Sequence, residues 1–211
     1  MIDLPRVYPI TDTEISGLSH ADQLANLSDG GATFVQLREK KLSPAQFFRE
    51  AMLALQLARQ RGVRVIINDR VDIALALRAD GVHLGQDDLP PEAARRLLGN
   101  EFTIGFSTHN LEQARQAMKL PIDYLAIGPV FPTNTKSNSE PTVGLAGVSA
   151  VRKAVGDFPI VAIGGITLSA AADVIDAGAS SVALISALLA TSGSTPKIVR
   201  ELFRTLEQHG N

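Results

Sequence analysis

One short stretch of this 211-residue chain places an amide and two cations at every second residue. In QLREK (36–40), Gln36, Arg38 and Lys40 are spaced two apart, so an extended backbone would place all three side chains on one face. Two cations beside an amide suit an anionic ligand. The alternative is a solvated loop in which Glu39 pairs with a neighbouring cation.

Carboxylates follow two further apolar runs. Asn68 and Asp69 come directly after VII (65–67), and Asp87 and Asp88 follow the run at 80–85. Carboxylates from two neighbouring strands, together with phosphate oxygens, commonly hold Mg²⁺. An Asp before LPPE is also a helix N-cap signal. One of Asp87 and Asp88 could therefore cap a helix while the other binds the metal, and spacing leaves the choice open.

Ser107 and His109, in GFSTHN (105–110), are the nearest approach to a nucleophile–base pair. They lie only two residues apart on an expected loop and outside a GxSxG motif. We therefore expect Ser107 to orient a substrate and His109 to be structural. Farther on, Gly164 and Gly165 lack side chains, so backbone amides there could approach an anion. The simpler alternative is a tight turn.

A long polar connection includes GPVFPTNTK (128–136), in which Thr133 and Thr135 offer hydroxyls and Lys136 a point charge. Its length and its Ser, Asn and Pro content favour a lid over the site. The alternative is a surface loop with an incidental lysine.

Composition excludes several classes of protein. Twenty Lys and Arg against 22 Asp and Glu give a net charge of −2, which argues against nucleic-acid or membrane-surface binding. The absence of cysteine excludes disulfides, thiolate nucleophiles and cysteine-bound metals. The N-terminus lacks the pattern of a signal peptide, and the run at 182–190 is too short for a bilayer. We expect a cytoplasmic protein.

Eight β-like runs must position these side chains. They alternate with helical patterns, and several are apolar on both faces, as parallel strands covered by helices are. An acid and a glycine repeatedly precede a strand, as in RADGVHL (78–84), which predicts left-handed glycines after helices. We predict one (β/α)₈ TIM barrel over residues 1–211, rather than an open doubly wound sheet, because no GxGxxG follows the first run. The runs are 6–12, 33–39, 63–69, 80–85, 102–107, 123–130, 160–165 and 181–186.

Six segments in this order resemble the thiamine-phosphate synthase family: QLREK, INDR, DGVHLGQDD, GFSTH, DYLAIGPVFPTNTK and AIGGI. The resemblance covers about residues 6–190. It implies a TIM-barrel enzyme that uses Mg²⁺. Such an enzyme joins 4-amino-2-methyl-5-hydroxymethylpyrimidine diphosphate to 4-methyl-5-(2-hydroxyethyl)thiazole phosphate, giving thiamine phosphate and diphosphate.

The resemblance also assigns roles to residues. It implies that Asp69 and Asp88 hold the metal and that Lys136, Arg38 and Ser107 act in catalysis. The pyrimidine diphosphate would contact Gln36, Leu37, Arg38, Glu39, Lys40, Asn68, Ser107 and Lys136. The thiazole phosphate would contact Thr133, Asn134, Thr135, Gly165, Ile185 and Ser186.

Two other functions compete with this one. A thiazole tautomerase on the same barrel would have no diphosphate to ionise, and so would not need Lys136, the Arg38–Lys40 pair and both acids together. A noncatalytic metabolite-binding regulator would need a partner-binding or DNA-reading segment, and the sequence shows neither such a segment nor a basic stripe.

Overall fold

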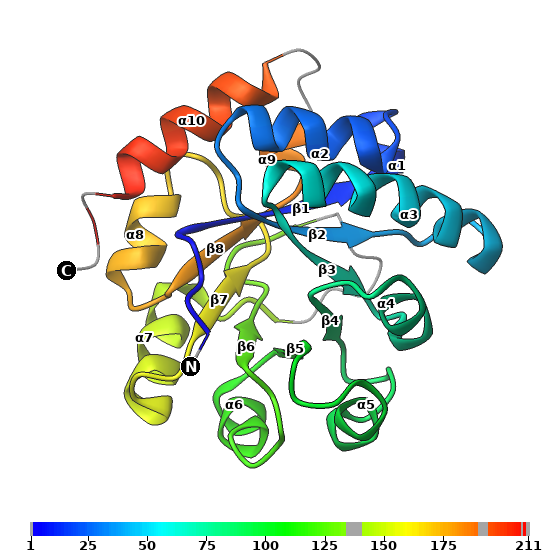
Figure 1. Cartoon of the computed structure of the whole chain (residues 1–211). Helices are drawn as coiled ribbons and strands as arrows, with labels where there is room; N and C mark the ends of the chain where they lie inside the picture. The colour runs from blue at the N-terminus through cyan, green and yellow to red at the C-terminus, as the bar shows by residue number, and fades with distance from the viewer. Residues whose placement is uncertain (1, 134–140, 190–193, 208, 210–211) are drawn as a thin grey trace.

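The computed structural model describes residues 2–133, 141–189, 194–207 and 209. Eight parallel strands close into a barrel in the order β1 to β8, and β8 pairs with β1 (Figure 1). This pairing confirms the predicted (β/α)₈ barrel and excludes the open sheet. The strands are β1 (Val7–Asp12), β2 (Phe34–Arg38), β3 (Arg64–Asn68), β4 (Gly81–Leu84), β5 (Thr103–Thr108), β6 (Tyr124–Ile127), β7 (Ile160–Ile163) and β8 (Ser181–Leu184).

Helices surround the barrel on its outside (Figure 1). Within the described ranges, no helix has the length and apolarity that a membrane span needs. The helices are α1 (Thr13–Ser16), α2 (His20–Asp29), α3 (Pro44–Arg61), α4 (Val71–Leu77), α5 (Pro91–Leu98), α6 (Leu111–Ala117), α7 (Gly144–Val155), α8 (Ala171–Asp176), α9 (Ser186–Leu189) and α10 (Thr195–Leu206).

The longest helix, α3, shows how local sequence sets the boundaries. Ser43 caps its first turn in a capping box with Gln46, and Pro44 occupies a first-turn position. Gly62 ends it with φ of 67°, as the predicted glycine pattern requires. The prediction is wrong for RADG, because Arg78 takes the left-handed position after α4, with φ of 51°. Gly81 instead begins β4.

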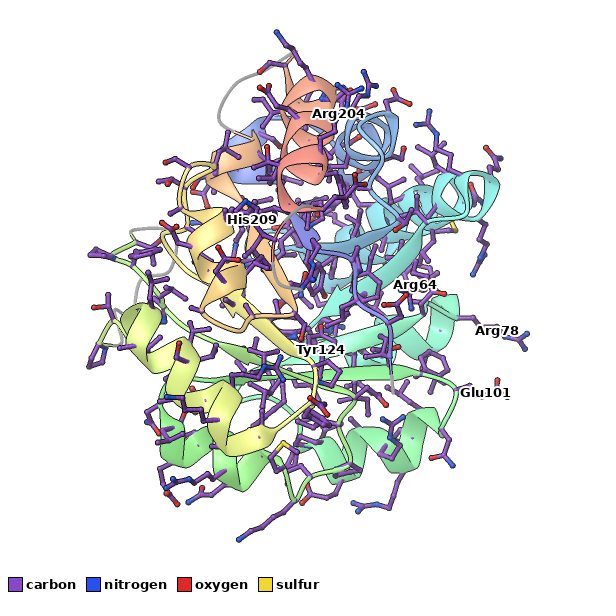
Figure 2. The ribbon with its side chains drawn as sticks, turned by 90° about the vertical axis from the view of Figure 1, so that its left-hand side faces the viewer. Arg64, Arg78, Glu101, Tyr124, Arg204 and His209 are labelled. Carbon is purple, nitrogen blue, oxygen red and sulfur yellow. The ribbon has the colours of Figure 1, made fainter. Side chains whose placement is uncertain are left out.

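The core has two layers because side chains of a strand alternate between its faces. A large aliphatic layer lies between the strands and the helices. A smaller layer fills the barrel and includes Tyr8, Phe34, Ile66 and Tyr124. Tyr124 is fully buried, and it is labelled near the middle of the view in Figure 2. Polar atoms in the interior must therefore form hydrogen bonds with one another rather than with water.

The N-terminal end of the barrel is closed by packing. Ile2 and Leu4 pack against the interior layer, and the Arg64 guanidinium lies 4.8 Å from the centre of the Phe34 ring. Arg64 also donates to the carbonyl of Asp3 at 2.7 Å. The opposite end of the barrel, where the strands finish, is therefore the end available for a binding site.

Candidate active site

A cavity of about 1350 Å³ lies at the C-terminal ends of the strands. Side chains and turns from β2, β5, β7 and β8 contribute to its wall, so segments distant in sequence share one space. Ten residues singled out from the sequence line it: Arg38, Glu39, Lys40, Ser107, His109, Thr133, Gly164, Gly165, Ile185 and Ser186.

Arg38 reaches the cavity in an ion pair with Asp12. The two residues are register partners across β1 and β2, and the guanidinium donates to one carboxylate oxygen of Asp12. The other oxygen accepts the backbone N–H groups of Glu14 and Ile15, each at 3.1 Å, and so caps α1. Both ion-pair side chains are nearly buried, at 12% and 9% exposure. The guanidinium is therefore held in place before any ligand arrives.

Lys40 and the two expected metal acids form a second charged group. Lys40 Nζ lies 2.5 Å from Asp69 Oδ2, and the Asp88 carboxyl is close enough to Asp69 to influence its ionisation. Burial raises the pKa of Asp69; Lys40 opposes the rise, whereas the Asp88 carboxylate adds to it. Asp69 also has an unusual left-handed backbone, with φ of 62°, and its N–H donates to the carbonyl of His83 at 2.8 Å. The strand ends thus hold two carboxyl groups side by side.

The alternative capping role for Asp87 or Asp88 is wrong. Helix α5 has Pro90 at its N-cap and no side-chain cap. Asp87 is exposed, whereas Asp88 is half-buried and accepts the N–H of Gly85 at 2.7 Å. Within the residues that the structure describes, no third His, Cys, Asp or Glu joins Asp69 and Asp88 as a metal-binding cluster.

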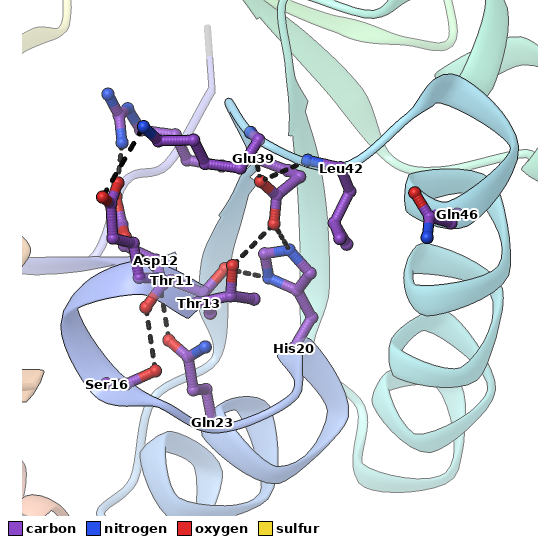
Figure 3. A network of polar contacts seen from close by, with 12 residues as sticks. Thr11, Asp12, Thr13, Ser16, His20, Gln23, Glu39, Leu42 and Gln46 are labelled. Carbon is purple, nitrogen blue, oxygen red and sulfur yellow. Dashed lines mark hydrogen bonds and ion pairs between the residues drawn. The ribbon is translucent and has the colours of Figure 1, made fainter.

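Glu39 belongs to a structural network rather than standing free at the cavity (Figure 3). Its carboxylate accepts Thr13 Oγ1 at 2.7 Å and the backbone N–H groups of Lys41 and Leu42 at 2.6 and 3.1 Å. Burial alone would raise the pKa of Glu39, but these hydrogen bonds outweigh it and lower the pKa. The network ties the turn after β2, which carries Lys40, to the start of α1.

His20 is a fully buried member of the same network. Thr11 Oγ1 lies 2.7 Å from its Nδ1 and 3.3 Å from the carbonyl oxygen of Gln36. Nε2 faces Glu39 Oε2 at 3.5 Å. Burial lowers the pKa of His20, although the charge of Glu39 opposes this. The neutral ring therefore forms part of the packing beneath Arg38 and Lys40.

Ser107 contacts His83 and not His109. Its Oγ lies 2.9 Å from His83 Nε2. His109 Nδ1 lies 2.7 Å from the carbonyl of Gly128, so this ring links the ends of β5 and β6. The hydrogen bonds give His109 the structural role that we expected, and they give the Ser107 hydroxyl a partner that we had not singled out.

The glycine pair after β7 forms a tight turn in the cavity wall. Gly164 and Gly165 have φ of 100° and 64°, which glycine adopts readily. A Cβ on Gly165 would lie 2.4 Å from the carbonyl oxygen of Pro132, so the turn packs against the segment that leads to Thr133. The pair therefore forms the tight turn of the simpler interpretation and lines the cavity, whereas anion binding by its amides stays a prediction.

The remaining predicted residues divide into three groups. Gln36 and Asn68 are buried near the cavity but do not line it. Leu37 is fully buried in the layer between strands and helices, which leaves only its backbone for a ligand. Asn134, Thr135 and Lys136 lie outside the described residues.

Sequence reasoning missed Asp12, His83 and the two tyrosines. Asp12 ends the first β-like run, in the position that Asp69 has in the third, and that parallel was a signal for it. His83, Tyr8 and Tyr124 lie within runs that read as apolar, and only the inward-facing register brings them together.

Comparison with known proteins agrees with this architecture. Residues 7–188 match the family model described as thiamine monophosphate synthase. A thiamine-phosphate synthase from Chloroflexus aurantiacus is 49% identical over 90% of this chain and 88% of its own length. One from Methanospirillum hungatei is 46% identical over 87% and 89%. A solved thiamine phosphate pyrophosphorylase from Pyrococcus furiosus superposes with a TM-score of 0.87 at 34% identity and 96% coverage of both chains. The chain therefore belongs to the thiamine monophosphate synthase family.

Proposed function

We propose that this enzyme makes thiamine phosphate in thiamine biosynthesis, by joining the pyrimidine diphosphate named above to the thiazole phosphate and releasing diphosphate. Family membership makes it a transferase. The observation that carries the proposal is the arrangement of Arg38 and Lys40, each paired with a carboxylate, at the wall of one cavity. Such an arrangement suits a ligand with several negative charges.

The donor set at Asp69 and Asp88 fits Mg²⁺. Two adjacent carboxyl groups are hard oxygen ligands, and Mg²⁺ in phosphate-handling sites is usually bound by one or two carboxylates together with substrate and water oxygens. The raised pKa of Asp69 reflects burial beside another acid, a cost that a divalent cation removes. When bound, the metal would neutralise charge on the diphosphate.

The chain's own side chains would assist departure of diphosphate. The bond between the pyrimidine methylene carbon and the diphosphate oxygen breaks, and the diphosphate keeps the electron pair. The electron-rich aminopyrimidine ring stabilises the resulting cation. Arg38 and Lys40 lie where negative charge grows, and Arg38 needs little reorganisation because Asp12 already holds it.

The second substrate completes the reaction without a nucleophilic side chain. Gly165, Ile185, Ser186 and Thr133 line the same cavity and would hold the thiazole phosphate. The thiazole nitrogen then donates its lone pair to the methylene cation, at the geometry that this anchoring sets. Roles for Asn134, Thr135 and Lys136 follow from the family resemblance.

The test is condensation by the purified protein, given both substrates with Mg²⁺ or with EDTA. We expect thiamine phosphate and diphosphate in equal amounts, and only with Mg²⁺. Isomerisation of the thiazole without condensation would favour the tautomerase, and binding without any turnover would favour the regulator. Either outcome contradicts the proposed function.

A further inference from the structure

A continuous line of hydrogen bonds crosses the inside of the barrel. Gln36 Nε2 lies 3.0 Å from the Tyr8 hydroxyl, which lies 2.9 Å from the Tyr124 hydroxyl. The Tyr124 hydroxyl is 2.9 Å from His83 Nδ1, and His83 Nε2 is 2.9 Å from Ser107 Oγ. The line consists of five side chains, from β1, β2, β4, β5 and β6. Its two ends, Gln36 and Ser107, are residues that were predicted to contact the pyrimidine.

The first bond sets the direction of all the others. The Gln36 nitrogen can only donate, so the Tyr8 oxygen accepts. Among the described residues, the acceptor for the Tyr8 proton is then Tyr124, whose own proton goes to His83 Nδ1. Because an accepting ring nitrogen carries no hydrogen, His83 must be protonated on Nε2 and donate to Ser107. The opposite direction would require the Gln36 amide to be turned over.

Because the two tyrosine hydroxyls are buried, no single one of these hydrogen bonds can reverse without leaving a polar atom unpaired. Tyr8 and Tyr124 are 1% and 0% exposed, and an unpaired hydroxyl there would lose its hydrogen bonds to water without replacement. Burial is also the main cause that raises the pKa of both phenols, so they keep the protons that the chain passes along. Gly105 leaves room for the line, since a Cβ at that position would lie 2.0 Å from Tyr124 Cζ.

We propose that this line makes Tyr8, Tyr124 and His83 positioning residues that fix the hydrogen-bonding polarity of the pyrimidine site. At one end, the Ser107 hydroxyl accepts from His83, so its hydrogen points to a ligand acceptor in the cavity. At the other end, the Gln36 amide nitrogen is engaged, so its oxygen is the atom left to accept from the donor of a pyrimidine that reaches past the cavity lining, to which Gln36 itself does not belong. The two ends are coupled, because reversing one reverses the other.

The polarity selects an aminopyrimidine over its oxo counterpart, an inference that rests on the proposed function. An exocyclic amino group donates to the Gln36 oxygen, and a ring nitrogen accepts from Ser107. The 4-oxo compound would place an acceptor against the Gln36 oxygen. Sites built to hydrogen-bond one polar group reject a mismatched analogue strongly, because buried groups are left unpaired.

The decisive measurement is the tautomer of His83, read by nitrogen-15 NMR of the full-length protein labelled in its four histidines. The His83→Gln variant identifies the signal. We expect hydrogen on Nε2 and none on Nδ1 in the wild-type protein. Hydrogen on Nδ1 would overturn the proposal, whether or not the protein condenses its substrates.

Two matched variants test the direction of the line. Tyr8→Phe removes one of the two partners of the Tyr124 hydroxyl, which then donates to His83 Nδ1, so the tautomer of His83 should be unchanged. Tyr124→Phe removes the donor to Nδ1, so the Nε2–H form should lose its dominance. Equal behaviour of the two variants would contradict the proposed direction.

The functional readout is the ratio of kcat/KM for the aminopyrimidine diphosphate to that for its 4-oxo counterpart. We expect Tyr124→Phe to lower this ratio by roughly tenfold, the worth of about one hydrogen bond. A residue with only a structural role would lower both rates together, and an unchanged ratio would overturn the proposal. Failure of the wild-type protein to condense either compound would instead refute the proposed function, while the NMR result would still decide the tautomer.

Discussion

Asp12 offers the sharpest test of how the site is prepared, because it has two separable tasks. One carboxylate oxygen caps α1 through Glu14 and Ile15, and the other pairs with Arg38. Asp12→Asn keeps an oxygen for the cap but removes the charge that holds the guanidinium. A hydrogen bond to a charged group is worth about 1.5–3 kcal/mol, so we expect the variant to lose about 2 kcal/mol of unfolding free energy. For a chain of this size the melting temperature should fall by roughly 4–8 °C.

The effect on turnover should be larger than this loss of stability suggests. Without its partner the nearly buried Arg38 shifts, and a displacement of about 1 Å in an active site can cost roughly 100-fold in rate. We therefore expect kcat/KM for the pyrimidine diphosphate to fall about 100-fold at a temperature where the variant is fully folded. A coupled assay for released diphosphate measures the rate, and thermal denaturation followed by circular dichroism measures the stability.

Asp123 provides the matched control. It accepts from Arg95 and from the N–H of Ile104, both at 2.7 Å, but it precedes β6 at the opposite end of the barrel. Its side chain is 37% exposed, so Asp123→Asn should cost less stability than the change at Asp12. We expect this variant to keep its activity. The reasoning fails if Asp12→Asn retains kcat/KM within threefold of wild type, or if Asp123→Asn loses as much activity.

Three further predictions concern the metal, the barrel interior and the pH dependence of stability. Asp69→Asn should raise the Mg²⁺ concentration for half-maximal condensation at least roughly tenfold, since even changes to residues that only orient a metal ligand cost about 10–100-fold; an unchanged Mg²⁺ titration would contradict the ligand role. Gly105→Ala should lower stability by about 1–3 kcal/mol in urea denaturation, because its Cβ would overlap Tyr124, and a neutral result would show that the ring can move. Burial lowers the pKa of His20 in the folded state below its ordinary 6.5, so the unfolded chain binds the extra proton first and stability falls as the pH drops through and below 6.5. His20→Gln should therefore show a shallower loss between pH 7 and pH 5, by up to about 1.4 kcal/mol per pH unit, and equal slopes in the two urea series would rule out this contribution.

The barrel could be predicted because its evidence is local. Each β-like run is short and apolar, and each is separated from the next by a helical pattern, so the eight strands were found where they were expected. The clustering of Arg38, Lys40, Asp69 and Asp88 followed from one rule, that the ends of parallel strands meet at one end of a barrel. The roles of these side chains stay predictions until they are measured.

What the sequence could not supply was the set of partners across strands. Asp12 and Arg38 are 26 residues apart and become neighbours only through the register of β1 with β2. The line from Gln36 to Ser107 likewise requires knowledge of which faces point inward. No local pattern distinguishes a buried tyrosine that donates a hydrogen bond from one that only packs.

Local signals also misled where two explanations compete for one residue. The glycine in RADG resembled the end of a helix, yet Arg78 takes that conformation, and Gly81 is needed because a Cβ would lie 2.1 Å from the carbonyl oxygen of Thr103. The Asp-rich turn before LPPE resembled a cap, yet the helix begins after Pro90. Close packing explains the glycine at position 81, and the helix start is set by Pro90 rather than by an aspartate cap.

The pairing of β8 with β1 has a consequence for the newly made protein. Val7 and Val182 are register partners, so 175 residues (182 − 7) must be added to the growing chain after Val7, up to and including Val182, before the two can pair. At about 5–20 residues per second, this delay is roughly 9–35 s. Throughout it, the nascent polypeptide carries an unpaired strand edge that a neighbouring nascent polypeptide could join. The yield of this protein should therefore depend on translation speed and chaperone supply, and not only on its final stability.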